Sequence, residues 1–370
     1  MEISFCPFVL YFWAMILKEF AYKKDRAARQ NDLELEKLSF SKLNLIVGKN
    51  ASGKSRVLNS IIEFAYIVTH YYGAVHGQWA VSFLDKDIEI KYQLEIENGK
   101  IVNEAIFENG KQLLQRSLKT TKIYSAKKQE HIKINPPNDR VIFSSRDTQE
   151  YPYLEKIVEW AENTYLFKFG EFNSRSSLSN EIGIKSPYTH NLNYFISKVN
   201  LTSDKDDVIK LFNKLGYEIS DFSLNTSNNN SLEVREKSLR LEIEQADLSQ
   251  GMFRSLVFLI FLKYLLKNEK QGTVMIDDLG EGLDYERVVK LGKIIIKLFK
   301  DSNFQLIATS NDSFLMDVVP IEYWNILIRE GSKVKCLNYQ NSKDIFDEFR
   351  FTGLIPFDLF SSDYLLSKTA

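Results

Sequence analysis

One stretch of this 370-residue chain has the residue types and spacing of a phosphate-binding loop. The segment "GKNASGKS", residues 48–55, follows the apolar run "KLNLIV" and has the form G-x-x-x-x-G-K-[ST]. In such a loop, backbone N–H groups face the phosphates, the lysine reaches the β- and γ-phosphates, and the last hydroxyl sits on Mg²⁺. The apolar run predicts a buried strand, and "RVLNSIIEFAYIV" predicts a helix. The sequence therefore predicts a nucleoside triphosphate site between a strand and a helix.

A second helix start with phosphate-binding character lies in "LSQGMFRSL", residues 248–256. Ser249, Gln250 and Gly251 place a hydroxyl and a glycine at a helix N-terminus, where unpaired backbone N–H groups point outward. An ordinary serine N-cap is the alternative interpretation. Because one nucleotide needs only one P-loop, a second start of this kind indicates a nucleotide shared between two subunits.

Carboxylates follow the next predicted strand. In "GTVMIDDLGEGLD", residues 272–284, a buried strand ends in Asp277 and Asp278. A carboxylate at such a strand end can complete the Mg²⁺ shell beside the P-loop hydroxyl, and the next one can orient the attacking water. A further strand, "QLIAT", is followed by polar residues that include Asn311. Since ligands of α/β sheets bind outside the carboxyl ends of the strands, the strand ends are expected to converge on the γ-phosphate.

The order of these motifs is similar to that of the ABC-type ATPases. It most closely resembles the bacterial AAA15/AAA21 group, relatives of the SMC, Rad50 and OLD-type proteins. "GKNASGKS", "KIVNEAIFENGKQLLQR", "ADLSQGMFRSL" and "IATSNDSFLMD" carry the resemblance, which covers about residues 15–120 and 240–330. It implies an α/β P-loop NTPase fold with ABC-ATPase head architecture: a mixed sheet, an antiparallel β meander and an inserted helical subdomain.

The resemblance also implies ATP and Mg²⁺ as ligands and assigns roles to residues. Ser55 and Asp277 are expected to hold Mg²⁺. Ser249, Gln250 and Gly251, which we call the signature residues, are expected to close on ATP bound by a second subunit. The expected catalytic residues are Lys54, Asp278 and Asn311. The expected nucleotide-contact residues are Gly48, Lys49, Asn50, Ala51, Ser52, Gly53, Lys54, Ser55, Arg56, Ser249, Gln250, Gly251 and, as the D-loop residue at the dimer interface, Asp284.

Two positions depart from the family pattern. Asp278 stands where the usual catalytic glutamate is expected, one methylene shorter, and Asn311 stands where a switch histidine is expected. An asparagine neither takes nor gives a proton at neutral pH. Both changes weaken water activation and γ-phosphate sensing, so the sequence predicts a slow ATPase that acts more as a switch than as a pump.

Outside the motifs, the sequence predicts the domain organisation. The expected units are an N-terminal ATPase lobe with P-loop and β meander at 15–110, a mainly helical insertion at 111–240, a C-terminal ATPase lobe at 241–340 and a tail at 341–370. Helical periods are expected in "YPYLEKIVEWAENTYLF" and "DDVIKLFNKLGYEI". Asn-Gly turns at 98–99 and 109–110 predict hairpins of the meander.

Composition restricts the class of protein further. The formal net charge is −1, so any binding to nucleic acid must use a local patch rather than a global field. Two cysteines far apart in the sequence fit a reducing cytoplasm and exclude a disulfide scaffold. The four histidines show no metal-ligand spacing. The first residues, "MEISFCPFVLYFWAMIL", are apolar but short for a membrane span. Residues 1–14 are interpreted as an upstream extension or a start-site artefact, and a membrane-surface anchor is the alternative.

A basic segment is the candidate surface for nucleic acid. Residues 111–133 contain one acid, Glu130, against seven basic residues: Lys111, Arg116, Lys119, Lys122, Lys127, Lys128 and Lys133. Tyr124 and His131 lie among them and could stack on bases. Lys119, Lys122, Lys127 and Lys128 are the expected DNA or RNA contacts, and a solvated basic face is the equal alternative.

Three function classes stay open. The first is an ATP-gated ATPase that forms a homodimer or higher homo-oligomer and controls an effector, a nuclease or a toxin encoded separately, in antiviral defence against phage. The second is an SMC- or Rad50-like ATPase of DNA repair or recombination, and the third is a transporter ATPase subunit. DNA-stimulated turnover would favour the second, and co-purification with a permease the third.

Overall fold

The computed structural model describes residues 15–24, 33–71, 76–179, 182, 191–200, 204–225, 231–238, 242–269 and 271–361. Its main feature is one mixed sheet, which within these residues holds 14 strands in the order β10-β14-β15-β3-β16-β17-β2-β1-β4-β5-β6-β7-β8-β9. The extension at residues 1–14 lies outside the described residues.

Five neighbouring strands of this sheet are parallel. They are β10 (Thr164–Lys168), β14 (Gly272–Asp277), β15 (Phe304–Thr309), β3 (Leu43–Gly48) and β16 (Trp324–Glu330). Every residue of β3, β14 and β15 is buried, as expected for strands covered on both faces. Because the strands are parallel, their carboxyl ends meet at one edge of the sheet.

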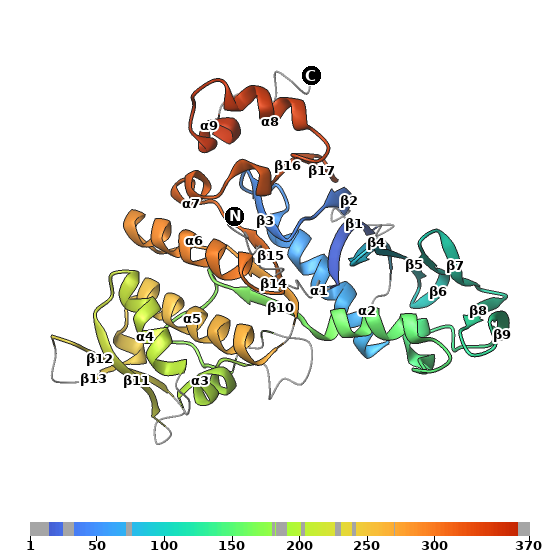
Figure 1. Cartoon of the computed structure of the whole chain (residues 1–370), viewed down its shortest axis with the longest axis horizontal. Helices are drawn as coiled ribbons and strands as arrows, with labels where there is room; N and C mark the ends of the chain where they lie inside the picture. Colours follow the sequence, from blue (N-terminus) through green and yellow to red (C-terminus); the bar gives the residue numbers. More distant parts are fainter. Residues whose placement is uncertain are drawn as a thin grey trace, which may run out of the picture.

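Two hydrophobic cores lie on the two faces of these strands. Alternate side chains point to opposite faces, so Leu45 and Val47 enter one core and Ile46 the other. Helices α1 (Lys54–His70) and α2 (Pro152–Glu162) cover one face. Helices α5 (Gln250–Asn268), α6 (Tyr285–Lys300) and α7 (Ser313–Val318) cover the other (Figure 1). The sheet is therefore the middle layer between two sets of helices.

The rest of the large sheet is mostly antiparallel and extends to one side of the molecule (Figure 1). Its strands are β17 (Lys333–Asn338), β2 (Leu33–Ser39), β1 (Ile16–Lys24), β4 (Gly77–Asp85), β5 (Ile88–Glu97), β6 (Lys100–Glu108), β7 (Lys111–Ser117), β8 (Thr121–Ser125) and β9 (Glu130–Ile134). Both predicted Asn-Gly turns are confirmed: Asn98, Gly99, Asn109 and Gly110 all have left-handed φ angles between 47° and 81°, the conformation of type I′ hairpin turns.

A smaller unit packs against α5. It contains α3 (Leu192–Asn200), α4 (Asp204–Lys214) and a second sheet of β11 (Ile219–Asn225), β12 (Ser231–Glu236) and β13 (Glu242–Glu244). Short 3₁₀ turns occupy Ile142–Ser145, Gln245–Asp247 and Ile321–Tyr323, and the tail forms α8 (Lys343–Arg350) and α9 (Pro356–Ser361).

The structure corrects the expected content of residues 111–240. The first part is not helical, because β7, β8 and β9 continue the meander by antiparallel pairing. The expected helix over "YPYLEKIVEWAENTYLF" ends at Glu162, and Thr164 begins β10 beside β14. The run "TYLF" is β-branched and aromatic, so it pairs readily once a buried strand lies next to it. The division of the chain into domains stays a prediction.

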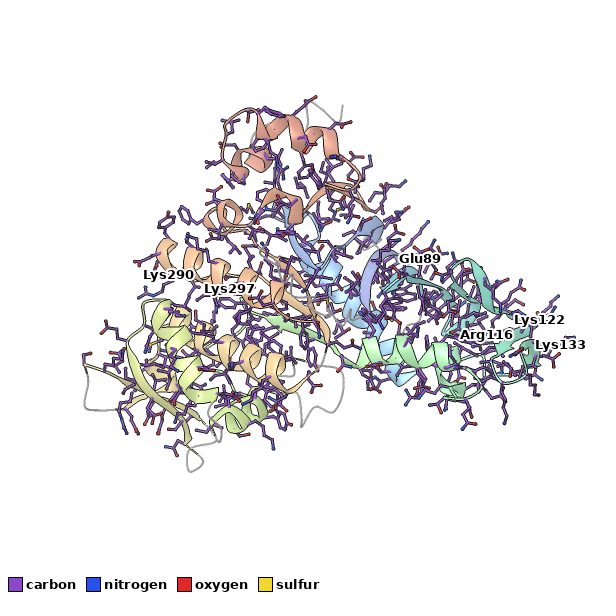
Figure 2. The ribbon with its side chains drawn as sticks, viewed as in Figure 1. Glu89, Arg116, Lys122, Lys133, Lys290 and Lys297 are labelled. Atoms are coloured by element: carbon purple, nitrogen blue, oxygen red, sulfur yellow. The ribbon has the colours of Figure 1, made fainter. Side chains whose placement is uncertain are left out.

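Arg116 does not belong to the basic surface proposed from the sequence. Its side chain is 1% exposed and donates to the carboxylate of Glu104 at 2.9 Å. It also donates to the carbonyl oxygens of Arg140 at 2.8 Å and Pro137 at 2.6 Å. Arg116 lies at the same end of the meander as Lys122 and Lys133 (Figure 2), so its burial and not its position separates it from the basic surface. This buried pair holds the loop after β9 against the meander.

In the described part of the chain no helix is long and apolar enough to cross a bilayer.

Candidate functional site

The P-loop occupies the turn between β3 and α1, as the motif predicts. Ala51 (φ 64°) and Gly53 (φ 107°) have left-handed backbones, which bend the chain sharply into the helix. A Cβ atom on Gly48 would lie 2.4 Å from Ser52 Oγ and 3.1 Å from Leu327 O, so a side chain at this position would force Ser52 to move. Arg329, at the end of β16, donates to Ala51 O at 3.0 Å and supports the loop from outside.

Lys54 is the first residue of α1 and is 6% exposed. Its Nζ donates to Gly48 O at 2.9 Å and to Lys49 O at 3.4 Å, so the lysine is folded back onto its own loop. Burial lowers the pKa of Lys54, and the nearby carboxylates of Asp278 and Asp277 oppose that shift. The cation therefore lies between the loop carbonyls and the acidic end of β14, where an anionic phosphate would meet it.

Asp277, at the end of β14, joins the end of β15 to the start of α1. Its Oδ1 accepts hydrogen bonds from Ser55 Oγ at 3.1 Å and from Thr309 Oγ1 at 2.6 Å. Thr309 Oγ1 in turn accepts from the N–H of Asp278 at 2.9 Å. Asp277 is 8% exposed. Thr309 was missed as a site residue, although it is the polar end of the quoted strand "QLIAT".

Asp278 lies beside a second carboxylate. A Cβ atom on Gly170, just after β10, would lie 3.3 Å from Asp278 Oδ2 and 2.5 Å from Glu281 Oε2. Burial raises the pKa of Asp278, as do the charges of Asp277 and Glu281, while Lys54 opposes the shift. A carboxylate with a raised pKa is a stronger base. Asp278 also has a left-handed φ of 52°, which aspartate adopts more readily than glutamate.

Arg254 on α5 connects the loops around this acidic end. Its Nε donates to Phe172 O at 2.8 Å, and Nη1 donates to Glu281 O at 3.0 Å. Nη2 donates to Gly170 O. The side chain is 12% exposed. Sequence reasoning missed this role: the residue lies within "LSQGMFRSL", but its acceptors lie in two other segments of the chain.

The signature residues form a second cluster. Ser249 is the N-cap of α5 and accepts from the N–H of Met252 at 3.2 Å, as the ordinary N-cap interpretation requires. Gln250 donates to Asn173 Oδ1 at 3.2 Å and to Ser174 Oγ at 3.1 Å. Between described residues, no hydrogen bond joins this cluster to the P-loop. The structure therefore brings the predicted site residues together in two groups.

Gly251 brings the start of α5 close to the loop before α6, and Asp284 caps α6. A Cβ atom on Gly251 would lie 2.8 Å from Gly282 O, so the start of α5 closely approaches the loop before α6. Asp284 is the N-cap of α6 and accepts from the N–H of Arg287 at 3.1 Å. Its carboxylate also pairs with the Arg287 guanidinium, which lies 4.3 Å from the ring centre of Tyr217.

Other predicted residues lie at the surface of the site. Lys49, Asn50 and Arg56 are exposed around the P-loop. Asn311 is also exposed, two positions beyond Thr309 and just before Asp312, the N-cap of α7. These positions face solvent at the edge where the strands end. Their roles stay predictions.

The residues present fit Mg²⁺ and a triphosphate. Ser52 Oγ is buried and has no hydrogen-bond partner among the described residues, although it lies inside the P-loop turn. Ser55 and Asp277 already meet at 3.1 Å and offer hydroxyl and carboxylate oxygens, which Mg²⁺ prefers together with phosphate and water. Within the described residues, no three His, Cys, Asp or Glu side chains gather as a separate metal site.

Comparison with known proteins gives a structural likeness only. No family model and no curated protein sequence matches the chain. The fold is similar to an SMC head bound to the C-winged helix domain of ScpA, with a TM-score of 0.51 and 13% identity over 89% of this chain and 99% of that one. An SMC head domain from Thermotoga maritima gives a TM-score of 0.45 at 12% identity, covering 87% and 98%. The Pyrococcus furiosus Smc head with an extended coiled coil, bound to the C-terminal domain of ScpA, gives 0.48 at 13%, covering 91% and 100%.

The likeness confirms the expected fold class. At this identity it concerns the fold alone, and it leaves the narrower resemblance to the AAA15/AAA21 group unconfirmed. The chain has the α/β P-loop fold of the ABC-type ATPase heads, with a mixed sheet of parallel and antiparallel strands.

Proposed function

We propose that this protein is an ATP-binding, slowly hydrolysing ATPase that forms a dimer around ATP and acts as a switch. One observation carries the proposal: Asp277 Oδ1 accepts from both Ser55 Oγ and Thr309 Oγ1, so the P-loop and two strand ends meet at one carboxylate. ATP with Mg²⁺ supplies a phosphoanhydride and the charge that polarises it. The protein itself contributes the groups at the carboxyl ends of the strands that bind the phosphates and activate the water.

The chain's own groups divide the work. Lys54 is held beside the loop carbonyls, where its charge can meet the β- and γ-phosphates. Ser55 and Asp277, which already meet at 3.1 Å, would hold Mg²⁺. Asp278, with its raised pKa, accepts a proton from water, and its short side chain reaches less far than a glutamate would. Asn311 offers a hydrogen bond but no proton transfer, so this chain is expected to hydrolyse ATP slowly.

Steady-state phosphate release tests the assignment of the base. Asp278→Ala is expected to lower turnover by about 10²–10⁴-fold. Asp278→Glu together with Asn311→His is expected to raise it above wild type, although the left-handed backbone at 278 opposes the glutamate. Asp301→Ala, an exposed acid at the end of α6, is the matched control. Brisk wild-type turnover that survives Asp278→Ala would transfer the role of base to Glu281.

We further propose that the ATP-bound dimer controls a separate effector, a nuclease or toxin, in bacterial anti-phage defence, in the cytoplasm. The resemblance of the motifs to the AAA15/AAA21 group supports this. In the proposed dimer, Ser249, Gln250 and Gly251 contact the ATP bound by the other subunit. The ion pair between Asp284 and Arg287 breaks, and the Asp284 carboxylate turns to the dimer interface. Light scattering of an Asp278→Ala variant, with and without ATP, tests the dimer: a mass that ATP does not change contradicts it.

A DNA-processing ATPase is the second candidate, and the tip of the meander favours it. Lys122 of β8 lies opposite Lys133 of β9 in the register, a pairing of like charges without an acid between them. Figure 2 shows both at the end of the sheet that lies farthest from α6. On the same strands Tyr124 meets His131 edge to face, with 5.4 Å between ring centres. Phosphates would relieve the repulsion, and Lys111, whose Nζ lies 3.8 Å from the centre of the Tyr124 ring, adds a further positive charge beside these residues.

Salt dependence tests this nucleic-acid surface. Replacing Lys119, Lys122, Lys127 and Lys128 with glutamine should lower the slope of log K against log salt by about 0.9 for each lost phosphate contact on duplex DNA. Lys333→Gln, an exposed lysine of β17, is the control. DNA-stimulated turnover would favour this candidate over the effector switch. An unchanged slope, or no binding by the wild type, would leave a solvated basic face.

A further inference from the structure

A groove between α6 and α7 lies outside the nucleotide site. It has a volume of about 740 Å³ and follows α6 from its first residue, Tyr285, to its last, Lys300. Val289, Ile296 and Val318 form an aliphatic floor. At 1.5 Å per residue, the 16 residues of α6 make the groove about 24 Å long, the length of a four-turn helix.

Two aromatic rings form one end of the groove. Tyr285 is 61% exposed and Phe314 is 44% exposed, and their rings meet edge to face with 4.8 Å between centres. Large exposed rings that support each other are typical anchors of protein interfaces. Because the surrounding floor is apolar, this end favours an apolar side chain of a partner.

Lysines form the rim toward the other end. Lys293, Lys297 and Lys300 recur at helical spacing on one side of α6. Lys293 and Lys297 form no ion pair with any residue that the structure describes, whereas Lys290 pairs with Glu286 and lies outside the groove. Figure 2 shows Lys290 and Lys297 projecting from α6.

Two acids, Asp301 and Asp317, also line the groove, and against its three lysines they leave a net charge of +1. Asp317 accepts from the N–H of Phe357 at 3.0 Å and so belongs to the start of α9. Asp301 is the C-cap residue of α6 and lies near Lys42. Burial lowers the pKa of Lys42, and the charge of Asp301 opposes that shift. The groove is therefore apolar along its floor and positively charged along its rim.

The groove is built from the two helices that leave the nucleotide site. Helix α6 begins after Asp284, and α7 begins after Asn311 and Asp312. Their packing is close, because a Cβ atom on Gly292 would lie 2.7 Å from Leu315 Cδ1. A ligand in the groove would touch both helices at once, and it would bias the positions of the strand-end loops before them.

We propose that this groove binds an acidic amphipathic helix of a partner protein, with its apolar face on the floor and its carboxylates against Lys293 and Lys297. The identity of the partner as an effector rests on the proposed function, but the binding chemistry does not. A helix lying in an apolar groove is a common mode of peptide recognition, and the basic rim selects for acidic sequence. Nucleic acid fits poorly, because an aliphatic floor offers no donors to phosphates.

The test uses the full chain without nucleotide and two labelled peptides of 16 residues. The acidic probe carries leucines on one face and glutamates on both flanks, and the basic probe has lysines in place of the glutamates. The acidic probe is expected to bind with salt-sensitive affinity. Lys293→Glu with Lys297→Glu should weaken it at least about tenfold and should bring binding of the basic probe, whereas Lys290→Glu should change neither. Phe314→Ala should also cost about tenfold or more.

Several outcomes would overturn the proposal. The first is that the acidic probe does not bind. The second is that the Lys293→Glu, Lys297→Glu chain, the reversed variant, binds the acidic probe as tightly as the wild type does. Binding that appears only in a chain ending at residue 361 would assign the groove to the protein's own tail. A change of oligomeric state in the reversed variant would assign it to a second copy, and competition by a short DNA duplex would assign it to nucleic acid. The peptide measurement needs no ATP, so it tests the groove independently of the proposed ATPase function. A Lys54→Ala chain that loses ATP binding but still binds the acidic probe would show that the two hypotheses stand or fall separately.

Discussion

Replacing Arg254 tests whether the loops of the nucleotide site depend on one side chain. The guanidinium donates to the carbonyl oxygens of Gly170, Phe172 and Glu281, on two loops that flank Asp278. A hydrogen bond to a charged group contributes about 1.5–3 kcal/mol. The bond to Glu281 O is exposed, so water can replace it at little cost, while the other two are partly buried. Two bonds at the lower value give about 3 kcal/mol for Arg254→Met.

The effect on turnover should be larger than the effect on ATP binding. The P-loop makes no hydrogen bond to Arg254 among the described residues, so ATP affinity is expected to hold. The loops that carry Asp278 and Glu281 lose their anchor, and a displacement of about 1 Å at such a site can lower the rate about 10²-fold. Arg254→Lys keeps the charge but not the fork of donors, and an intermediate loss is expected.

Urea unfolding, calorimetry with ATP and phosphate release together measure these effects. Lys263→Met is the matched control, because it lies on the same helix and its pair with Asp207 is partly exposed. Such a pair contributes about 0–1 kcal/mol and should leave turnover unchanged. The reasoning is refuted if Arg254→Met retains wild-type unfolding and turnover. Lower stability with full turnover would limit Arg254 to a role in folding.

Further predictions concern single groups. Lys54→Ala should abolish ATP binding or turnover without unfolding the chain, and unchanged calorimetric binding of ATP in a folded variant would contradict the P-loop assignment. Arg116→Met should lower the free energy of unfolding in urea by about 3–5 kcal/mol, because Glu104 stays buried without its cation. Replacing both Arg116 and Glu104 with apolar residues should restore much of that loss. If the single and the double variant lose equally, the buried ion pair is not the cause. Because the pKa of Asp278 is raised in the folded state, ionisation there lowers stability as pH rises through that pKa. Asp278→Asn should therefore raise the melting temperature at pH 7 and not at pH 4, and turnover of the wild type should fall with acid at a higher pH than an ordinary aspartate would give.

Local patterns in the sequence were enough to predict much of the site. The P-loop spacing fixes a turn between a strand and a helix, and the left-handed residues Ala51 and Gly53 are found there. The apolar run before Asp277 has the length and the polar end of a buried parallel strand, and it is one. The Asn-Gly dipeptides determine the hairpins at 98–99 and 109–110, because few residues tolerate two consecutive left-handed conformations. Each of these features depends on neighbours along the chain.

Pairing between distant segments could not be predicted in this way. The run "TYLF" has the composition of a buried helix or of a strand, and only its pairing with β14 makes it β10. Arg116 reads as part of a basic surface, yet the carboxylate that buries it lies on the neighbouring strand β6. The three acceptors of Arg254 and the close approach at Gly292 likewise depend on how helices pack on the sheet. Sequence patterns determine period and turns, whereas the partners of a side chain follow from the packing that buries the most apolar surface.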